Sequence, residues 1–158
     1  MLARETDVSY PQLDKNAARI VKKVAQEIAY EFELDYVGTE HILLAILRHR
    51  GGVGVKVLQG FDVTEDQARE TVEEVLKRDM EDTWVFGRLP GSPHYRNVLA
   101  HAIDEATQLE AKRIGSEHLL LALLREQGST AQRVLAKLGV TLKKCRAAVL
   151  KQLSEETG

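Results

Sequence analysis

Apolar residues recur every three to four positions along most of this chain, which is the pattern of amphipathic α-helices. Between Asp14 and Glu33 they form one stripe, made of Ala17, Ile20, Val21, Val24, Ala25, Ile28, Ala29 and Phe32. A short helix is expected at about 53–59, and the Thr64-Glu-Asp-Gln67 pattern of a capping box opens another helix to about Lys77. The second half predicts the same succession, with helices at about 93–112, 116–126, 129–137 and 141–153.

One predicted helix in each half is apolar almost all round. Thr39 is expected to cap the first of them, and Glu40 then lies at the positive end of the helix dipole. Ser116 is expected to cap its counterpart, while Ser129 and Thr141 cap the two helices that follow. A helix without a polar face needs cover on all sides, so the two halves are expected to pack against each other.

A twelve-residue motif occurs twice. Val37–Arg48 reads VGTEHILLAILR, and 77 residues later Ile114–Arg125 reads IGSEHLLLALLR, with eight of the twelve positions identical. The same register extends over about 65 residues in each half. The predicted segments are an N-terminal arm (1–12), a first repeat (13–78), a linker (79–92), a second repeat (93–153) and a tail (154–158). We therefore predict an all-α fold in which two four-helix repeats, related by a pseudo-twofold axis, pack as one eight-helix domain.

The paired motifs, each followed by a Val-Leu pair and a Gly-Val-Thr-like helix start, resemble the double Clp-N domain. That domain stands at the N-terminus of AAA+ unfoldases such as ClpA and ClpC, and also occurs in short stand-alone proteins. The resemblance implies a non-enzymatic module that binds proteins for the Clp unfoldase–protease system. The implied partners are Clp subunits, adaptor proteins or substrate proteins. The chain would then be either the recognition domain of a larger unfoldase or a stand-alone protein that acts as an adaptor, an accessory subunit of a Clp complex or a decoy. A dozen unmatched residues before the first repeat favour the stand-alone form.

The resemblance also implies a candidate ligand. In Clp-N domains of the ClpC type, the motif glutamate helps to bind the guanidinium of phosphoarginine, and hydroxyl groups near helix starts help to hold the phosphate. Glu40 and Glu117 are the matching carboxylates, preceded by the hydroxyls of Thr39 and Ser116. A further hydroxyl, Ser92, is expected at the start of the second repeat's first helix. The equivalent place in the first repeat is Asp14-Lys15, where a carboxylate would repel phosphate, so the second repeat is favoured.

Two alternatives to a phosphoarginine pocket follow from the residues themselves. The motif glutamates can simply serve helix capping, and the histidines after them can be half-buried residues satisfied by a backbone carbonyl. Protein binding can instead use Trp84, Val85 and Phe86, an aromatic cluster in the predicted linker. The competing interpretation of Trp84 is that it folds back over the junction of the repeats as core.

Charge and composition narrow the function classes. A net charge of −2 gives no electrostatic case for nucleic-acid binding. No apolar run is long enough to span a bilayer and no signal peptide is visible, which favours a cytoplasmic protein, or an organelle stroma after processing. The absence of a long heptad seam favours a monomer.

Catalytic and metal-binding signals are weak. The chain has no Gly-x-x-x-x-Gly-Lys-Ser/Thr stretch, so we expect no ATP site and no cofactor. Cys145 lies between two cations that would lower its pKa, but no histidine partner is near it in sequence. His94 and His101 share one face of a predicted helix, which alone is too little for a metal site.

Overall fold

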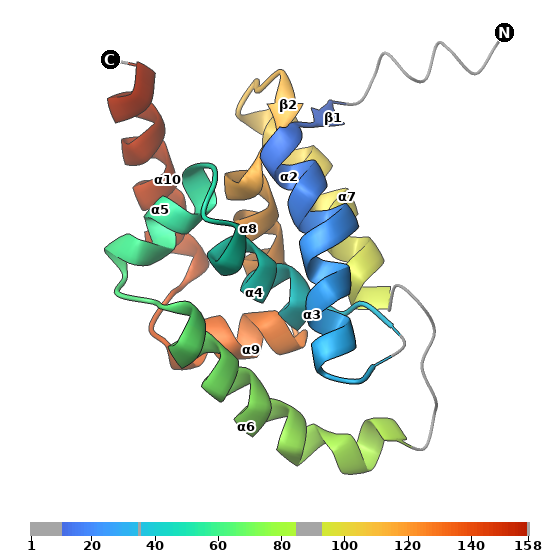
Figure 1. Ribbon diagram of the computed structural model, residues 1–158. Helices are drawn as coiled ribbons and strands as arrows, with labels where there is room; N and C mark the ends of the chain where they lie inside the picture. Colours follow the sequence, from blue (N-terminus) through green and yellow to red (C-terminus); the bar gives the residue numbers. More distant parts are fainter. Residues whose placement is uncertain (1–10, 35, 85–92, 158) are drawn as a thin grey trace, which may run out of the picture.

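The computed structural model describes residues 11–34, 36–84 and 93–157, and their side chains except those of 77–84 and 157. In this part of the chain there are eight helices and one pair of two-residue strands (Figure 1). The first helix is continuous through three segments, α2 (Lys15–Arg19), the π-helical η1 (Ile20–Val24) and α3 (Ala25–Glu31). The first repeat continues with α4 (Thr39–His49), α5 (Val53–Gly60) and α6 (Glu65–Trp84). The second repeat contains α7 (Pro93–Gln108), α8 (Ser116–Arg125), α9 (Thr130–Lys137) and α10 (Leu142–Thr157).

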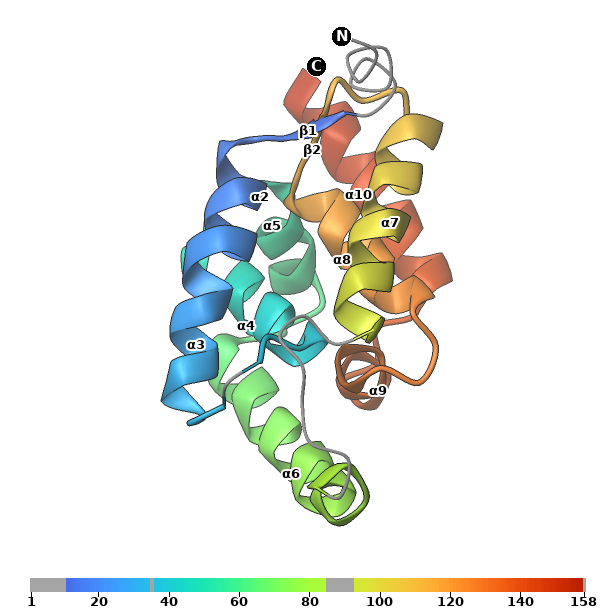
Figure 2. The ribbon, with the colours of Figure 1, turned by 90° about the vertical axis from the view of Figure 1, so that its right-hand side faces the viewer.

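The two motif helices, α4 and α8, lie side by side at the centre of the fold (Figures 1 and 2). Every residue of α4 from Thr39 to Leu47 is buried, as is α8 from Ser116 to Leu124 apart from the half-buried Glu117. Each motif helix also packs on the first helix of its own repeat. The prediction of two central helices covered on all sides is therefore confirmed.

The third helix of each repeat packs on the other repeat. Helix α5 contacts α8 and α10, and in the same way α9 contacts α4 and α6. This reciprocal pattern is what a pseudo-twofold axis produces, so the structure has one core rather than two. The predicted all-α fold of two packed repeats is confirmed.

The motif hydroxyls cap helices across this axis, which corrects the sequence prediction. The N-caps of α4 and α8 are Gly38 and Gly115 rather than Thr39 and Ser116. Instead, Ser116 Oγ accepts the N–H of Gly54 in the first turn of α5 at 2.8 Å. Thr39 Oγ1 accepts the N–H of Ala131 in the first turn of α9 at 3.1 Å. Each repeat thus supplies a capping acceptor to the other.

Other helix ends follow the local signals more closely. Ser129 Oγ accepts the N–H of Gln132, and Thr141 Oγ1 accepts the N–H of Lys144, so both predicted caps are confirmed. Two helices are longer than expected. Helix α6 runs to Trp84 rather than ending near Lys77, and α10 runs through most of the predicted tail to Thr157. Part of the segment assigned to the linker is therefore helical.

A short parallel strand pair was not expected from the sequence. Strand β1 (Gln12–Leu13) pairs with β2 (Arg113–Ile114), and the N–H of Asp14 donates to the carbonyl of Ile114 at 2.8 Å. The pairing begins inside the segment predicted to be a loose arm. Its consequence is that the start of α2, in the first repeat, is held beside the start of α8, in the second (Figure 2).

Candidate protein-binding site at the starts of helices α2 and α8

The two motif histidines are fully buried and have a structural role. His41 Nδ1 accepts the N–H of Gly38 at 2.9 Å, and His118 Nδ1 accepts the N–H of Gly115 at 2.8 Å. The sequence interpretation of a histidine satisfied by the backbone is right, but the partner is an N–H group and not the predicted carbonyl. In the neutral ring the proton must then lie on Nε2. Among the described residues neither Nε2 has a hydrogen-bond partner.

Burial keeps both rings uncharged at neutral pH. Desolvation lowers the pKa of His41 to about 4, and it also lowers the pKa of His118. A neutral imidazole with its acceptor nitrogen already engaged does not act as a general base at these positions. We therefore assign the histidines to the architecture of the helix start.

The two motif carboxylates differ in accessibility. Glu40 has a side chain only 3% exposed, and the hydroxyl of Tyr36 donates to its Oε2 at 3.4 Å. Glu117 is 13% exposed, and in the described part of the chain it pairs with no arginine or lysine. Burial raises the pKa of Glu117, a hydrogen bond from its own backbone N–H opposes this, and the charge of Asp14 adds to the rise. Glu117 is therefore a mostly buried carboxylate that no cationic side chain of the described residues neutralises.

The first helix of one repeat meets the motif of the other, whereas the sequence prediction placed both parts of a pocket in the same repeat. Asp14 caps α2 by accepting the N–H of Ala17 at 2.8 Å. Its Oδ2 lies 3.0 Å from the place where a Cβ on Gly115 would stand, and that Cβ would collide with Glu117 Oε1. Gly115 thus allows two carboxylates from different repeats to converge on one helix start.

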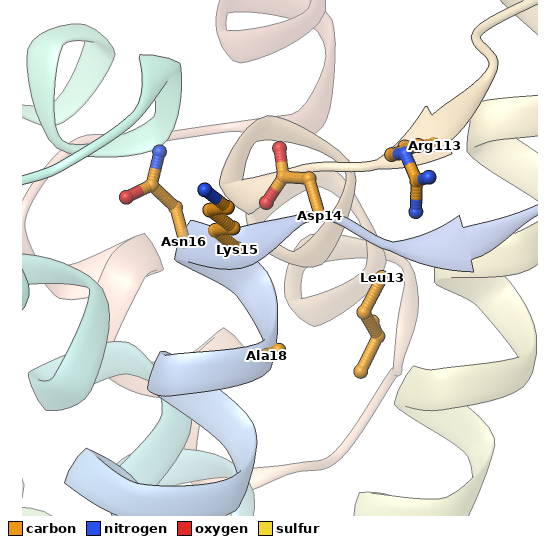
Figure 3. Close-up of a pocket in the computed structure, with 6 residues that line it drawn as sticks. All are labelled: Leu13, Asp14, Lys15, Asn16, Ala18 and Arg113. Atoms are coloured by element: carbon orange, nitrogen blue, oxygen red, sulfur yellow. The ribbon is translucent and has the colours of Figure 1, made fainter.

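An open pocket of about 560 Å³ lies next to this helix start (Figure 3). It is lined by Leu13, Asp14, Lys15, Asn16, Ala18 and Arg113. The side chains of Lys15 and Arg113 bring two exposed cations to the same opening as Asp14. The pocket can therefore contact a cationic group of a ligand through Asp14 and an anionic group through Lys15 and Arg113.

Other sequence-predicted site residues are not tested by the structure. Ser92, Val85 and Phe86 lie outside the described residues. Trp84 is the last residue of α6, but its side chain is not among those described. Binding through these residues therefore stays a prediction.

The weak catalytic and metal signals find no support. Cys145 is buried, and desolvation raises the pKa of its thiol to about 12, which opposes a nucleophilic role. His94 Nδ1 and His101 Nε2 both bond the carboxylate of Glu126, at 2.6 and 3.0 Å, and Asn97 Nδ2 donates to it at 2.8 Å. Within the described ranges no group of three or more potential ligands is placed to hold a metal ion.

Sequence reasoning missed two neighbours of the motif carboxylates, Asp14 beside Glu117 and Tyr36 beside Glu40. Tyr36 and Arg113 occupy equivalent positions in the 77-residue register. Their difference was therefore visible in the sequence once the repeats were aligned. The approach of Asp14 was not visible, because it depends on the strand pair that joins the two repeats.

Comparison with known proteins gives a consistent assignment. The profile of the family described as "Clp repeat (R) N-terminal domain" matches twice, over residues 13–93 and 90–158. The chain is 36% identical over 144 residues to the ATP-dependent Clp protease ATP-binding subunit ClpC of Staphylococcus epidermidis. The matched region covers 91% of this chain and 17% of that protein. The subunit of the same name from Staphylococcus aureus is 35% identical with the same coverage. The chain therefore spans 17% of the length of these curated relatives.

Two solved structures share the fold. The N-terminal domain of the chaperone ClpD from Arabidopsis thaliana has a TM-score of 0.74 at 24% identity, covering 90% of this chain and 95% of that one. The N-terminal domain of Hsp104 from Candida albicans has a TM-score of 0.62 at 17% identity, covering 88% of this chain and 89% of that one. As in the sequence, no described helix is long and apolar enough to cross a membrane. The curated relatives named above are bacterial, which gives the organelle-stroma alternative no support.

Proposed function

Because the chain belongs to the Clp repeat N-terminal domain family, we propose that it is a non-enzymatic module of the Clp unfoldase–protease system that binds substrate or adaptor proteins. Domains of this family are non-catalytic N-terminal modules of Clp chaperones. The observation that carries the proposal is the environment of Glu117. A mostly buried carboxylate that lacks a cationic partner costs free energy, and a partner's arginine or lysine would offset that cost.

The geometry favours a partner's basic side chain as the group that reaches this site. Glu117 and Asp14 converge on the start of α8 from two repeats, and their joint charge attracts a cation. The carboxylate of Glu117 is only partly exposed, so a bound guanidinium would be shielded from water. Its hydrogen bonds to the carboxylate are stronger in such a shielded place than in water. Glu40, covered by Tyr36, offers a weaker version of the same site.

A phosphoarginine receptor is the second candidate, and one observation favours it. Lys15 and Arg113 line the pocket beside Asp14, so a phosphate on a bound arginine would find cations close by. Asp14 opposes this candidate, since its carboxylate already occupies the N-cap of α2, where a phosphate would otherwise bind. The two candidates therefore differ in whether the phosphate strengthens or weakens binding.

One titration series separates the two candidates. A labelled lysozyme, reduced and alkylated with iodoacetamide so that no charge is added, supplies a basic, permanently unfolded probe, used with and without enzymatic phosphorylation of its arginines. We expect the unphosphorylated probe to bind the wild type, and Glu117→Gln to weaken this binding at least about tenfold. Glu70→Gln, which removes one exposed charge on α6, is the matched control and should leave binding unchanged. Binding that appears only after phosphorylation, and is lost in Glu117→Gln, would replace the main proposal with the phosphoarginine receptor.

A stand-alone accessory subunit predicts a different result. In that case neither form of the probe binds, and the chain co-elutes with a Clp ATPase–protease complex even when both motif glutamates are replaced by alanine. Size-exclusion chromatography of the mixture measures this directly. Co-elution that is lost when Glu117 is replaced would instead support the proposal that the site at Glu117 binds a protein.

A further inference from the structure

The first helix carries an exposed basic face on the outside of the molecule. Lys15, Arg19, Lys22 and Lys23 are all exposed, and their spacing of three and four residues places them along one side of α2 and η1. In the described part of the chain none of these four side chains forms an ion pair or a side-chain hydrogen bond. Figure 2 shows this helix along the outer edge of the domain. Lys15, at its start, lines the same pocket as Arg113.

The stability of the helix does not explain this arrangement. Cations are favoured near the C-terminus of a helix and anions near its N-terminus. Here Lys15 stands in the first turn and Glu31 in the last, which is the opposite order. Arg19 and Lys23 are also like charges four residues apart, a spacing at which they repel each other. A charge pattern that costs helix stability suggests that the charges are kept for a partner.

The second repeat has no equivalent face. In the 77-residue register the four cationic positions correspond to Ser92, Arg96, Leu99 and Ala100, so only one of them is charged. The basic face is therefore not a consequence of the shared fold. It distinguishes one side of the domain from the other.

An exposed tyrosine extends the face toward the end of the helix. Tyr30 is 77% exposed and lies seven residues after Lys23, which places it on the same side of the helix as that lysine. Tyrosine and arginine are enriched among the residues that dominate binding energy at protein interfaces. From Lys15 to Tyr30 the face measures about 22 Å, the length of a short helical segment of a partner.

We infer that this face, which comprises Lys15, Arg19, Lys22, Lys23 and Tyr30, docks an acidic segment of a partner protein. The inference rests on the proposed function and adds a second contact, of opposite charge to the one at Glu117. Carboxylates on the segment would face the four cations, and an apolar side chain would cover Tyr30. The charge complementarity then orients the partner along the helix.

The boundaries of the face favour a protein segment over a nucleic acid. Asp14 precedes the cations, and the exposed Glu27 lies between the last cation, Lys23, and Tyr30. Glu31, next to Tyr30, is engaged by Arg48 and Arg69. A nucleic acid carries phosphates at regular intervals and would run past the cations onto Asp14 and Glu27. A short protein segment can place its carboxylates beside the four cations only, and an apolar side chain beyond them over Tyr30.

The test uses a fluorescein-labelled, glutamate-rich peptide with interspersed leucines, followed by fluorescence anisotropy against the whole chain. We expect Lys22→Glu with Lys23→Glu to weaken binding at least about tenfold and to abolish most of its salt dependence. Tyr30→Ala should weaken it about threefold while leaving the salt dependence intact. The matched control is Lys143→Glu with Lys144→Glu, an exposed lysine pair on α10, and it should change binding less than about twofold. Unchanged circular dichroism and melting temperature in each variant show that the fold is intact.

Three results would overturn the inference. They are no binding of the acidic peptide, an equal loss in the α10 control, and tighter binding of a labelled single-stranded oligonucleotide than of the peptide. The unfolded basic probe keeps this test separate from the proposed function, because its binding depends on Glu117 and not on Lys22 and Lys23. If only the basic probe fails to bind, the site at Glu117 is wrong and the basic face stands. If only the acidic peptide fails to bind, the inference about the basic face is wrong and the proposed site at Glu117 stands.

Discussion

The two repeats build the same backbone frame and surround it with different polar side chains. In the first, Glu40 is covered by the hydroxyl of Tyr36 and His41 is flanked edge-on by the rings of Phe32 and Tyr36. In the second, the equivalent of Tyr36 is Arg113, which lines the open pocket, and Glu117 has Asp14 as its charged neighbour. The frame is preserved because both repeats need it for one core. The polar surroundings are free to differ, and the second motif is the one left accessible.

Arginine pairs show the same divergence. Arg48 and Arg69 share the exposed carboxylate of Glu31 in the first repeat. Their equivalents Arg125 and Arg146 share Glu105, whose side chain is 3% exposed. The position of Glu105 corresponds to Ile28 in the first repeat, so a buried apolar residue and a buried ion pair occupy equivalent places. Substitutions at equivalent positions of the two repeats test how much these differences contribute to stability.

The largest difference between the repeats is expected in how the buried histidines change the stability of the fold at acid pH. The pKa of His41 is about 4 when folded and near 6.5 when unfolded, so the unfolded state takes up the proton first. Stability is therefore fully present above pH 6.5 and falls as the pH drops toward 4, by about 3 kcal/mol for a shift of this size. His118 shifts in the same direction, but the charges of Asp14 and Glu105 oppose its shift. Urea unfolding at a series of pH values should give a shallower slope in His41→Asn than in the wild type.

The control for this prediction is His118→Asn. Because its shift is opposed by nearby carboxylates, this variant should flatten the pH dependence less than His41→Asn does. Asparagine keeps an acceptor close to the position of Nδ1, so the N–H groups of Gly38 and Gly115 need not lose their partner. Parallel slopes in the wild type and both variants would show that the histidines do not set the acid response.

The second expected effect concerns the buried carboxylate of Glu105. Glu105→Ala removes the oxygen that Arg125 and Arg146 share, at 3.0 and 2.6 Å, and leaves Arg125 only its pair with Asp104 at 2.7 Å. Both arginines are partly exposed, so we expect a loss of about 2 kcal/mol in the free energy of unfolding, less than for a fully buried pair. The matched change in the first repeat, Glu31→Ala, should cost under about 1 kcal/mol because that carboxylate is exposed. Glu105→Ile, which imitates Ile28, should recover part of the loss, and an equal cost at Glu31 and Glu105 would contradict the comparison.

A similar or slightly smaller effect is expected where α5 crosses α8. A Cβ on Gly54 would lie 2.9 Å from the carbonyl oxygen of Ser116, which is backbone and cannot easily move. Gly54→Ala should therefore cost about 1 to 2 kcal/mol by overpacking, although alanine is the better helix former. The equivalent position already holds Ala131, so the two crossings are not identical. Thermal unfolding of Gly54→Ala measures the effect, and a stabilised variant would mean that the crossing relaxes without cost.

The sequence alone was sufficient for the fold because its determinants are local. Periodicity defined the helices, and the doubled motif defined two repeats with central apolar helices. The polar details depend on residues far apart in the chain. Thr39 serves a helix start 92 residues away, and Ser116 serves one 62 residues away. A hydroxyl before a glutamate looks like a local N-cap, and only the packing of the repeats shows which helix it caps.

The candidate site was predictable in its parts but not in its assembly. Glu40 and Glu117 were identified from the motif, and Asp14 was recognised as a carboxylate at the start of the first helix. What joins Asp14 to Glu117 is the pairing of β1 with β2, two strands too short to leave a periodic pattern. The arrangement therefore had to be seen in three dimensions, where a position expected to repel a phosphate became the neighbour of the motif carboxylate.

The hydroxyls of Thr39 and Ser116 each cap a helix of the other repeat. Removing them should have the smallest effect on stability, but it tests most directly how the repeats depend on each other. Ser116→Ala removes the acceptor of the Gly54 N–H, and Thr39→Ala removes that of the Ala131 N–H. Each loss should cost about 1 kcal/mol, the usual value for a helix cap, and the shorter bond of Ser116 should make its loss the larger. Hydrogen exchange locates the effect: Ser116→Ala should speed exchange at the start of α5, in the other repeat, while α8 itself stays protected. Faster exchange confined to the start of α8 would mean that each hydroxyl serves its own helix after all, and that the repeats are joined by apolar packing alone.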